Sequence, residues 1–493
     1  MKKILMISSE CFPYARTGGL SEVIPALSEA LNRSSKEVRV QIIIPFYREV
    51  SKNAPSSAVI ESCGYKSKIT IDGRDFEGEL FTTSISKKTR LYFVKNDHFF
   101  DREGIYRNEH GDYPDNADRF YFFSQFIVNA IIDSVLETDI LHVHDWHSSL
   151  IPALIKSSYK KNEEINKKLD KIKTLLSIHN IGYQGILSAK VCRWAGFDLN
   201  DFPETIFGKL DGENTLNFLK TGIYFADKIN TVSPTYAKEI QGVEYGFGLE
   251  SLLQTRRSDL LGIINGANYE TWSPEKDKLI PANYTSSDLR GKEICKKALS
   301  EYLGFEYEKD VPIIGVIARL SYQKGLDLLV SVWEEFCALN MKFVVLGNGD
   351  DGLETFFLSQ ANQNSNKIGV KIEFDVKLSH LIQAGSDMFL MPSRYEPCGL
   401  TQIHGMKYGT IPIVRETGGL KDTVENYNEE NSTGTGFIFK EINSRNMLNE
   451  IKRALYAYNN KEVWNRIMKS AMAKDFSYLK VSSEYLKLYN SMM

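Results

Sequence analysis

Residues 392–401 read PSRYEPCGLT and connect a predicted buried strand at 386–391 to a predicted helix at 401–408. Gly399 has no Cβ atom, so a ligand can approach the backbone closely there. The first N–H groups of the following helix have no intrahelical acceptor and carry the positive end of the helix dipole. Together with Glu396 at the entrance of the turn, they suit a sugar joined to a phosphate. The alternative is that Arg394 and Glu396 only pair with each other.

Length, charge and cysteine content place limits on the class of protein. The chain has 493 residues, enough for two or three domains, and a formal net charge of −3. This charge gives no general attraction to nucleic acid or to an anionic membrane, so any anion site is local. The six cysteines are scattered without a CxxC pair, which is typical of reduced thiols in the cytoplasm. We predict no disulfide, no signal peptide and no membrane-spanning segment.

The N-terminal half opens with a βαβ pattern. Predicted strands at 3–8 and 38–44 flank an amphipathic helix at 21–32, and the turn before this helix contains Thr17-Gly18-Gly19-Leu20. The turn is of a phosphate-binding kind, although it could also hold no ligand. It lacks the GxGxxG spacing of nicotinamide-binding domains, and Ile44-Pro45 stand where a dehydrogenase needs an acidic residue. Residues 51–95 are predicted as a strand meander or an inserted lobe, and 117–136 as a long helix with core aromatics.

Histidines and an aspartate gather at the end of a predicted strand at 140–145, in the sequence HVHDWH. His142 and His144 share one face of the strand, which invites a metal interpretation. No further cluster downstream supplies the rest of a coordination shell, so we expect no metal. Instead, Asp145 and His147 should project from the carboxyl end of a parallel strand, where open α/β sheets bind ligands. The next predicted strand, 174–178, ends in His179 in the same way.

A second βα series follows a charged segment at 273–310. Its strands are predicted at 312–318, 342–346, 370–374, 388–391 and 411–414, which indicates a second doubly wound domain. Arg319 and Lys324 flank the loop after the first of these strands, where a guanidinium and an ammonium group suit phosphate oxygens. The tetrapeptide TGGL recurs at 417–420 after a strand. Two such turns in matching domains favour a ligand held between the domains.

A series of motifs resembles the bacterial glycogen synthase and plant starch synthase family over nearly the whole chain. After a Lys-rich first strand, the motifs are RTGGL, HVHDWH, SIHNIGYQG, TVSPTYAKEI, ING, WSPE, RLSYQKGLDL, LGNGD, PSRYEPCGLTQ and the second TGGL. The resemblance implies the GT-B fold, an α/β fold of two Rossmann-like doubly wound domains facing across a cleft. We place the domains at 1–262 and 263–477, and expect a last helix within 478–493 that crosses back to the N-terminal domain.

The resemblance also implies an activity. A member of this family transfers glucose from ADP-glucose to the 4-hydroxyl at the non-reducing end of an α-1,4-glucan, with retention at the anomeric carbon and without a metal or other cofactor. The partners would be the glucan, such as glycogen, and the nucleotide-sugar donor, with no nucleic acid or membrane, in the cytoplasm. The alternatives are a retaining glycosyltransferase that uses UDP-glucose or another acceptor, and a glucan-binding pseudoenzyme. The pseudoenzyme would have lost Arg319, Lys324 or Glu396, and all three are present.

Motif positions imply roles for individual residues. Arg319 and Lys324 would neutralise the diphosphate and Glu396 would bind glucose hydroxyls, while Asp145 and His179 would line the sugar. These five are the predicted catalytic residues. The predicted nucleotide-sugar-binding residues are Arg16, Thr17, Gly18, Gly19, Gly399, Leu400, Thr401 and Asn265. Tyr106, Trp146 and His147 are predicted near the sugar or the acceptor.

The chain departs from the family pattern at several positions. Arg16 stands where the family usually has Lys, and Glu22 where it usually has Asp. Residues 267–268 are Ala-Asn where Val-Asp is common, and His404 stands where some retaining relatives carry a ribose-binding Glu. Arginine keeps the charge but changes its reach, which leaves donor affinity and nucleotide choice open. Retention could arise from acceptor attack on the face that the diphosphate leaves, or from a double displacement through a carboxylate nucleophile.

Overall fold

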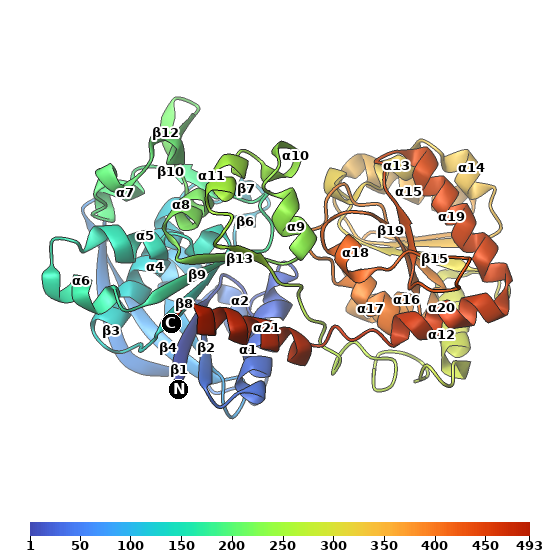
Figure 1. Ribbon diagram of the computed structural model, residues 1–493, viewed down its shortest axis with the longest axis horizontal. Helices are drawn as coiled ribbons and strands as arrows, with labels where there is room; N and C mark the ends of the chain where they lie inside the picture. Colours follow the sequence, from blue (N-terminus) through green and yellow to red (C-terminus); the bar gives the residue numbers. More distant parts are fainter. The chain divides into compact units, whose positions relative to one another are not determined.

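The computed structural model describes residues 1–493, which divide into two compact units (Figure 1). The first unit contains Met1–Val232, Ala237–Gly266 and Tyr478–Met493, and the second contains Ser233–Tyr236 and Ala267–Ser477. The main division therefore follows residue 266, against 262 in the sequence-based placement. No helix has the length and the apolar character needed to span a membrane.

The first unit is built on a nine-stranded sheet of order β14-β13-β9-β8-β1-β2-β5-β4-β3. Its strands are β1 (Lys2–Ile7), β2 (Val38–Pro45), β3 (Glu61–Ile71), β4 (Arg74–Ser84), β5 (Arg90–Lys95), β8 (Ile140–His144), β9 (Lys173–Ile178), β13 (Lys228–Thr231) and β14 (Leu260–Gly262). The central strands are parallel, and β8 is buried along its whole length, as expected for a sheet covered on both faces. The chain builds outward from β1 through β2, then returns to place β8 on the other side of β1. The strand order thus reverses between β1 and β8, at the kind of switch point where such sheets bind ligands.

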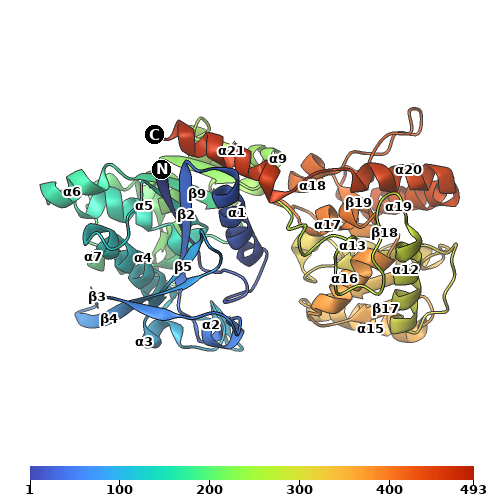
Figure 2. The ribbon, with the colours of Figure 1, turned by 90° about the horizontal axis from the view of Figure 1, so that it is seen from below.

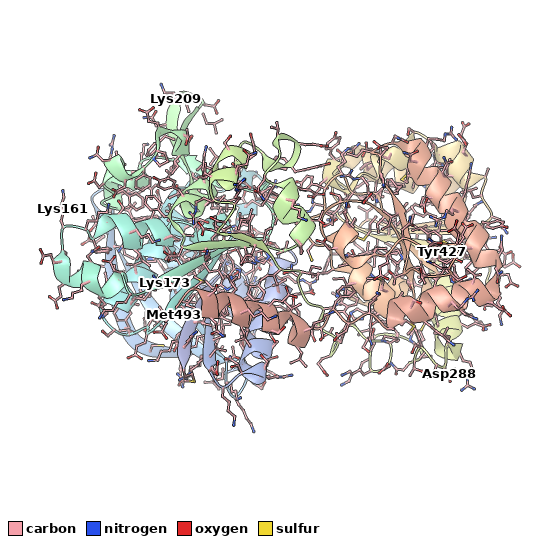
Figure 3. All side chains as sticks on the ribbon, viewed as in Figure 1. Lys161, Lys173, Lys209, Asp288, Tyr427 and Met493 are labelled. Atoms are coloured by element: carbon pink, nitrogen blue, oxygen red, sulfur yellow. The ribbon has the colours of Figure 1, made fainter.

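The segment 51–95 forms the predicted meander. Strands β3, β4 and β5 pair antiparallel in succession, and β5 pairs parallel with β2. The meander therefore extends the main sheet, and the alternative of an inserted lobe was wrong. A separate small sheet of β10 (Ile186–Ser188), β11 (Phe207–Leu210) and β12 (Glu213–Asn217) was not predicted. Its β11–β12 hairpin, which carries Lys209, projects from the first unit (Figure 3).

Helices lie on both sides of this sheet (Figures 1 and 2). The aromatic side chains of α4 (Asn116–Ile132) are buried, as predicted. The last helix of the chain, α21 (Tyr478–Ser491), packs beside α1 (Leu20–Ser34) (Figure 2). The other α-helices of four or more residues before the division are α2 (Arg48–Asn53), α3 (Asp97–Phe100), α6 (Glu163–Leu169), α7 (Val191–Trp194), α8 (Phe218–Phe225), α9 (Pro234–Glu239), α10 (Val243–Gly246) and α11 (Glu250–Thr255).

The second unit contains a six-stranded, all-parallel sheet of order β17-β16-β15-β18-β19-β20. Its strands are β15 (Ile313–Ile317), β16 (Lys342–Leu346), β17 (Ile368–Lys371), β18 (Met388–Met391), β19 (Ile411–Arg415) and β20 (Phe437–Phe439). Here the order reverses between β15 and β18. The helices are α12 (Arg290–Leu303), α13 (Asp327–Val330), α14 (Trp333–Cys337), α15 (Asp351–Gln363), α16 (Val376–Gly385), α17 (Thr401–Lys407), α18 (Gly418–Thr423), α19 (Ser444–Asn459) and α20 (Lys461–Met472).

One strand prediction in this unit needs correction, and one strand was not predicted. The strand predicted at 370–374 is β17 at 368–371, because pairing with β16 ends at Lys371 and the chain then turns to cap α16 with Asp375. The short edge strand β20 was missed, since three residues show too little periodicity to distinguish. The two doubly wound α/β units themselves confirm the predicted fold class.

Candidate active site

The two strands that flank the switch point of the second unit bring together Lys324 and Glu396. Glu396 lies in the turn between β18 and α17 and is 5% exposed, while Lys324 lies in the loop after β15. The Lys324 Nζ atom is 2.6 Å from Glu396 Oε2, and the Ser393 hydroxyl donates to the same oxygen at 3.0 Å. The structure thus joins two residues that lie far apart in the sequence and were predicted to act at one site.

Arg394 does not pair with Glu396, so that alternative interpretation was wrong. Its guanidinium binds both carboxylate oxygens of Asp327, at 2.6 and 2.7 Å, and lies 3.8 Å from the centre of the Tyr322 ring. Arg319 lies two residues after the end of β15 and is exposed. The edge therefore presents the exposed Arg319 together with Lys324, which is paired with Glu396.

The turn at Gly399 has a conformation that favours glycine. Its φ is +71°, and a Cβ atom would lie 2.4 Å from Gln402 Oε1. The Gln402 amide in turn donates to the carbonyl oxygens of Cys398 and Gly399, each at 3.0 Å. No side chain caps α17 at Leu400, so the N–H groups at the start of this helix are not used by a capping group.

The second TGGL turn packs directly on the backbone of the Glu396 segment. The Gly419 N–H donates to the Glu396 carbonyl oxygen at 3.0 Å. A Cβ atom at Gly418 would lie 1.9 Å from that oxygen, and one at Gly419 would lie 2.1 Å from the Cys398 carbonyl oxygen. These two glycines are therefore explained by close backbone contact, which the sequence interpretation of a ligand-binding turn did not foresee.

Asp145 follows β8 at the switch point of the first unit and has an unusual backbone. Its φ of 53° and ψ of −173° lie in a backbone region that residues other than glycine rarely adopt, and this conformation costs about 1–3 kcal/mol. Its Oδ1 atom accepts the His179 N–H at 2.8 Å. Burial raises the pKa of Asp145 to about 7, although backbone N–H groups of His179 and Asn180 oppose the shift. The strain and the perturbed acid together make this strand end a candidate functional site.

His179 lies opposite a second histidine. Its Nε2 atom is 3.0 Å from His144 Nδ1, and burial lowers the pKa of His179 to about 4, so both rings are neutral at pH 7. The His144 Nε2 atom is buried and has no hydrogen-bond partner. We assign the His144 proton to Nδ1, which then donates to His179. A proton on Nε2 would instead leave a buried N–H group without an acceptor. His179 then carries its own proton on Nδ1 and can donate it to a ligand.

Tyr106, His147 and Trp146 form a stack. The Tyr106 and His147 ring centres are 4.5 Å apart, and those of His147 and Trp146 are 3.9 Å apart. His147 and Trp146 are 7% and 9% exposed, so they pack behind Tyr106. Gly185 is required beside Trp146, because a Cβ there would lie 2.5 Å from the indole ring. Asn265 follows β14 and is 7% exposed.

Comparison with known proteins identifies the family. A family model described as the starch synthase catalytic domain matches residues 3–255, and one described as glycosyl transferases group 1 matches residues 305–470. A glycogen synthase of Fervidobacterium nodosum is 41% identical over 99% of this chain and 98% of its own length. A glycogen synthase of Thermosipho melanesiensis is 40% identical over 100% of this chain and 99% of its own. The chain belongs to the glycogen synthase and starch synthase family.

Solved structures agree with this assignment. The catalytic domain of starch synthase IV from Arabidopsis thaliana, which was solved bound to ADP and acarbose, superposes with a TM-score of 0.88. It is 30% identical, with coverage of 100% of this chain and 99% of that one. A sucrose-phosphate synthase from Thermosynechococcus elongatus shares the fold, with a TM-score of 0.57 at 16% identity. The predicted GT-B fold and the predicted family are thus confirmed, and the chain is a glycosyltransferase.

Two departures from the family pattern are partners in the structure. The Arg16 guanidinium is 2.8 Å from a Glu22 carboxylate oxygen, so the longer acid meets the bulkier base across the first turn of α1. His404 is buried and stacks on Trp272 with ring centres 4.2 Å apart, and burial lowers its pKa to about 3. Its ring belongs to the core of the second unit and supplies no carboxylate for a ribose.

One histidine of the alternative metal interpretation, His142, contacts protein groups through both of its ring nitrogens. His142 Nδ1 lies 2.9 Å from the Tyr489 hydroxyl and Nε2 lies 2.6 Å from the Ser177 hydroxyl. No group of three or more His, Cys, Asp or Glu side chains is arranged to hold a metal ion.

The structure also reveals one buried acid that the sequence interpretation missed, Glu10, which holds the first TGGL turn and Tyr106. Its signal in the sequence was a carboxylate three residues after the end of β1, at the predicted ligand edge.

Proposed function

We propose that this chain is a glycogen synthase that transfers glucose from ADP-glucose to the 4-hydroxyl at the non-reducing end of an α-1,4-glucan, with retention. The single observation that carries the proposal is the Lys324–Glu396 pair in the PSRYEPCGLT turn, within a chain that matches glycogen synthases over its full length. Lys324 provides a cation for the leaving diphosphate and Glu396 an acceptor for glucose hydroxyls. The ADP bound to the similar plant enzyme supports ADP as the nucleotide.

Charge on the leaving diphosphate is met by protein groups. Arg319 is exposed and Lys324 is partly exposed at one sheet edge, and the start of α17 adds N–H groups without a side-chain cap. Preorganised charge of this kind is usually the largest contribution to such catalysis. We therefore propose that the reaction needs neither a metal nor another cofactor, and that the partners are the glucan and the nucleotide-sugar. A location in the cytoplasm remains our expectation from the scattered thiols.

The sugar is proposed to meet Asp145 and His179. The Asp145 carboxylate would stabilise positive charge on the oxocarbenium-like transition state, and the His179 Nδ1–H would donate to a sugar hydroxyl. Asp145 already accepts two backbone N–H groups, and Glu396 is paired with Lys324. Because neither carboxylate is free as a nucleophile, we favour attack of the acceptor hydroxyl on the face that the diphosphate leaves. The bond to the diphosphate oxygen breaks, the new glycosidic bond forms, and the diphosphate accepts the acceptor's proton.

The test is donor-dependent release of nucleoside diphosphate with glycogen as acceptor, with ADP-glucose and UDP-glucose compared at equal concentration. We expect ADP-glucose to be preferred, and Lys324→Ala and Glu396→Ala each to reduce kcat/KM at least about a hundredfold. Glu335→Ala serves as the matched control, because Glu335 also pairs with a cation but on an exposed helix pair. That control should keep its activity within about twofold of the parent.

Other results would select the alternative functions. A preference for UDP-glucose would overturn the donor assignment and leave the glycosyltransferase intact. Glycogen binding without turnover of either donor would support the pseudoenzyme, with Arg16, Glu22 and Asn268 as the residues to restore to the family pattern. A loss of activity in Glu335→Ala equal to that in Glu396→Ala would remove the assigned role of the ion pair.

A further inference from the structure

Glu10 has a carboxylate that is 3% exposed and is surrounded by hydrogen-bond donors. The Thr17 N–H and the Gly18 N–H donate to Oε2 at 2.6 and 3.1 Å. The Thr17 hydroxyl and the Tyr106 hydroxyl donate to Oε1, each at 2.6 Å. Each carboxylate oxygen thus receives two hydrogen bonds.

Four donors fill the acceptor positions of an ionised carboxylate, which has two oxygens and about four lone-pair sites. Glu10 therefore has no position left for a hydroxyl of a ligand or for a metal ion. A carboxylate held in this way is also a poor nucleophile, because attack would break hydrogen bonds that stabilise its charge. Its contribution must come through the groups that it holds.

The four donors belong to parts of the candidate site that lie far apart in the sequence. Thr17 and Gly18 belong to the first TGGL turn before α1, whereas Tyr106 lies in the loop before α4. Because the Tyr106 hydroxyl gives its proton to Glu10, it accepts a hydrogen bond from the Ser9 hydroxyl at 2.7 Å, and its ring stacks on His147. Glu10 itself follows β1 at the switch point. One carboxylate therefore connects three segments at the ligand edge of the sheet.

This arrangement limits what the first glycine turn can offer a phosphate. The N–H groups of Thr17 and Gly18 already donate to a buried anion, so a ligand would have to displace Glu10 to use them. The next N–H groups, of Gly19 and Leu20, begin α1 and have no intrahelical acceptor. The predicted nucleotide-sugar contacts at Thr17 and Gly18 are thus better assigned to Gly19 and to Arg16.

We propose that Glu10 is a positioning residue for the donor: its carboxylate fixes the turn at residues 16–19 and the orientation of Tyr106 before the substrate binds. This inference rests on the proposed function. Glu10 keeps the exposed end of the turn, at Gly19, in one conformation, and it holds the Tyr106 ring against His147. The entropic cost of ordering the turn is therefore met when the chain folds, and it does not reduce the affinity for the donor.

The first variant is Glu10→Gln, which keeps the shape of the side chain. The amide has one oxygen in place of two and directs an NH2 group at two of the four donors. We expect KM for ADP-glucose to rise at least about tenfold while KM for glycogen stays within about twofold. Glu49→Gln is the matched control, because it removes a half-buried carboxylate from α2 of the same unit. An equal rise of both KM values, or no rise for ADP-glucose, would overturn the proposal.

A double-mutant cycle with Tyr106→Phe separates positioning from direct contact with the substrate. If Glu10 acts by holding Tyr106, the loss caused by Tyr106→Phe should shrink at least about threefold in the Glu10→Gln background. Additive losses would indicate independent contacts and overturn the inference. If Glu10→Gln does not fold, Thr17→Val carries the test, because Thr17 is exposed and loses only its hydroxyl bond. It should raise KM for ADP-glucose about threefold or more, and an unchanged KM would count against the proposal.

Binding of ADP to the same proteins, followed by calorimetry, distinguishes this inference from the proposed function. A parent chain that binds ADP, and a Glu10→Gln variant that binds it at least about threefold more weakly, support the positioning role even without turnover. A parent chain that neither binds ADP nor turns over ADP-glucose would overturn the proposed function and, with it, this inference. Equal ADP affinities in an active parent and an active variant would overturn the positioning role alone.

Discussion

At the scale of single residues, Lys324 faces two anions that compete for it. In the structure it binds Glu396, which is almost fully buried, yet in the proposed reaction it binds a diphosphate oxygen. ADP binding would require Lys324 to leave Glu396. Because ADP has no glucose whose hydroxyls could bind Glu396, the loss of the ion pair is not offset, and the pair weakens ADP binding. The same pair keeps Glu396 satisfied before the donor arrives, because an unpaired buried carboxylate would be costly.

Glu396→Gln should therefore bind ADP more tightly than the parent chain while losing glucosyl transfer. We expect a gain of about threefold to tenfold in affinity, the size of a partly exposed ion pair, measured by calorimetry. Glu335→Gln should leave the ADP affinity unchanged. Weaker ADP binding in Glu396→Gln would show that Glu396 contacts the nucleotide or holds the loop, and would contradict the competition.

Asp145 predicts a dependence of stability on pH. Burial raises the pKa of Asp145 to about 7 in the folded chain, above its pKa in the unfolded chain. The protonated acid therefore contributes fully to stability at a pH below the unfolded-state pKa, and this contribution is lost as the pH rises through about 7. Asp145→Asn stays neutral at every pH. Its advantage in thermal unfolding over the parent should grow between pH 5 and pH 8, towards about 4 kcal/mol. Parallel stability curves for the two proteins would contradict the assigned pKa.

At the scale of elements, the strand, turn and helix at 386–408 were predictable because apolar runs and a glycine turn are local signals. The partner of Glu396 could not be predicted, since Lys324 lies in the loop after a different strand, β15. Only the order of the strands in the sheet brings the two residues together. Arg394 shows the opposite error, because its near neighbour Glu396 was considered while its actual partner Asp327 lies in α13. Glu10 was missed because the sequence does not show that the turn at Thr17 and the distant Tyr106 both donate to its carboxylate.

The second TGGL turn offers a test at this scale. Gly418→Ala should push the Glu396 backbone away, because its Cβ would lie 1.9 Å from the Glu396 carbonyl oxygen. We expect kcat to fall at least about tenfold. Gly304→Ala is the matched control: Gly304 also has a positive φ, of +74°, but the space around it is open, so only a loss of stability of about 1 kcal/mol is expected. Equal losses of activity in the two variants would contradict a role of the turn in placing Glu396.

At the scale of the whole molecule, each unit has its own switch point and supplies its own part of the predicted site. Asp145 and His179 belong to the first unit, and Arg319, Lys324 and Glu396 belong to the second. The helix α21 belongs to the first unit although it ends the chain. Its tyrosines Tyr485 and Tyr489 bind Asn230 and His142 in the buried layer behind the strand ends. The proposed transfer thus uses residues of both units.

The most direct test of the central claim is the structure of the product made from ADP-glucose labelled with ¹³C at the anomeric carbon and a short α-1,4-glucan. We predict a labelled glucose at the non-reducing end, joined by a new α-1,4 linkage that NMR identifies from the anomeric coupling and the shift of C4, together with release of ADP. A β linkage, a label at any other position, or hydrolysis to free glucose without transfer would contradict the proposed function.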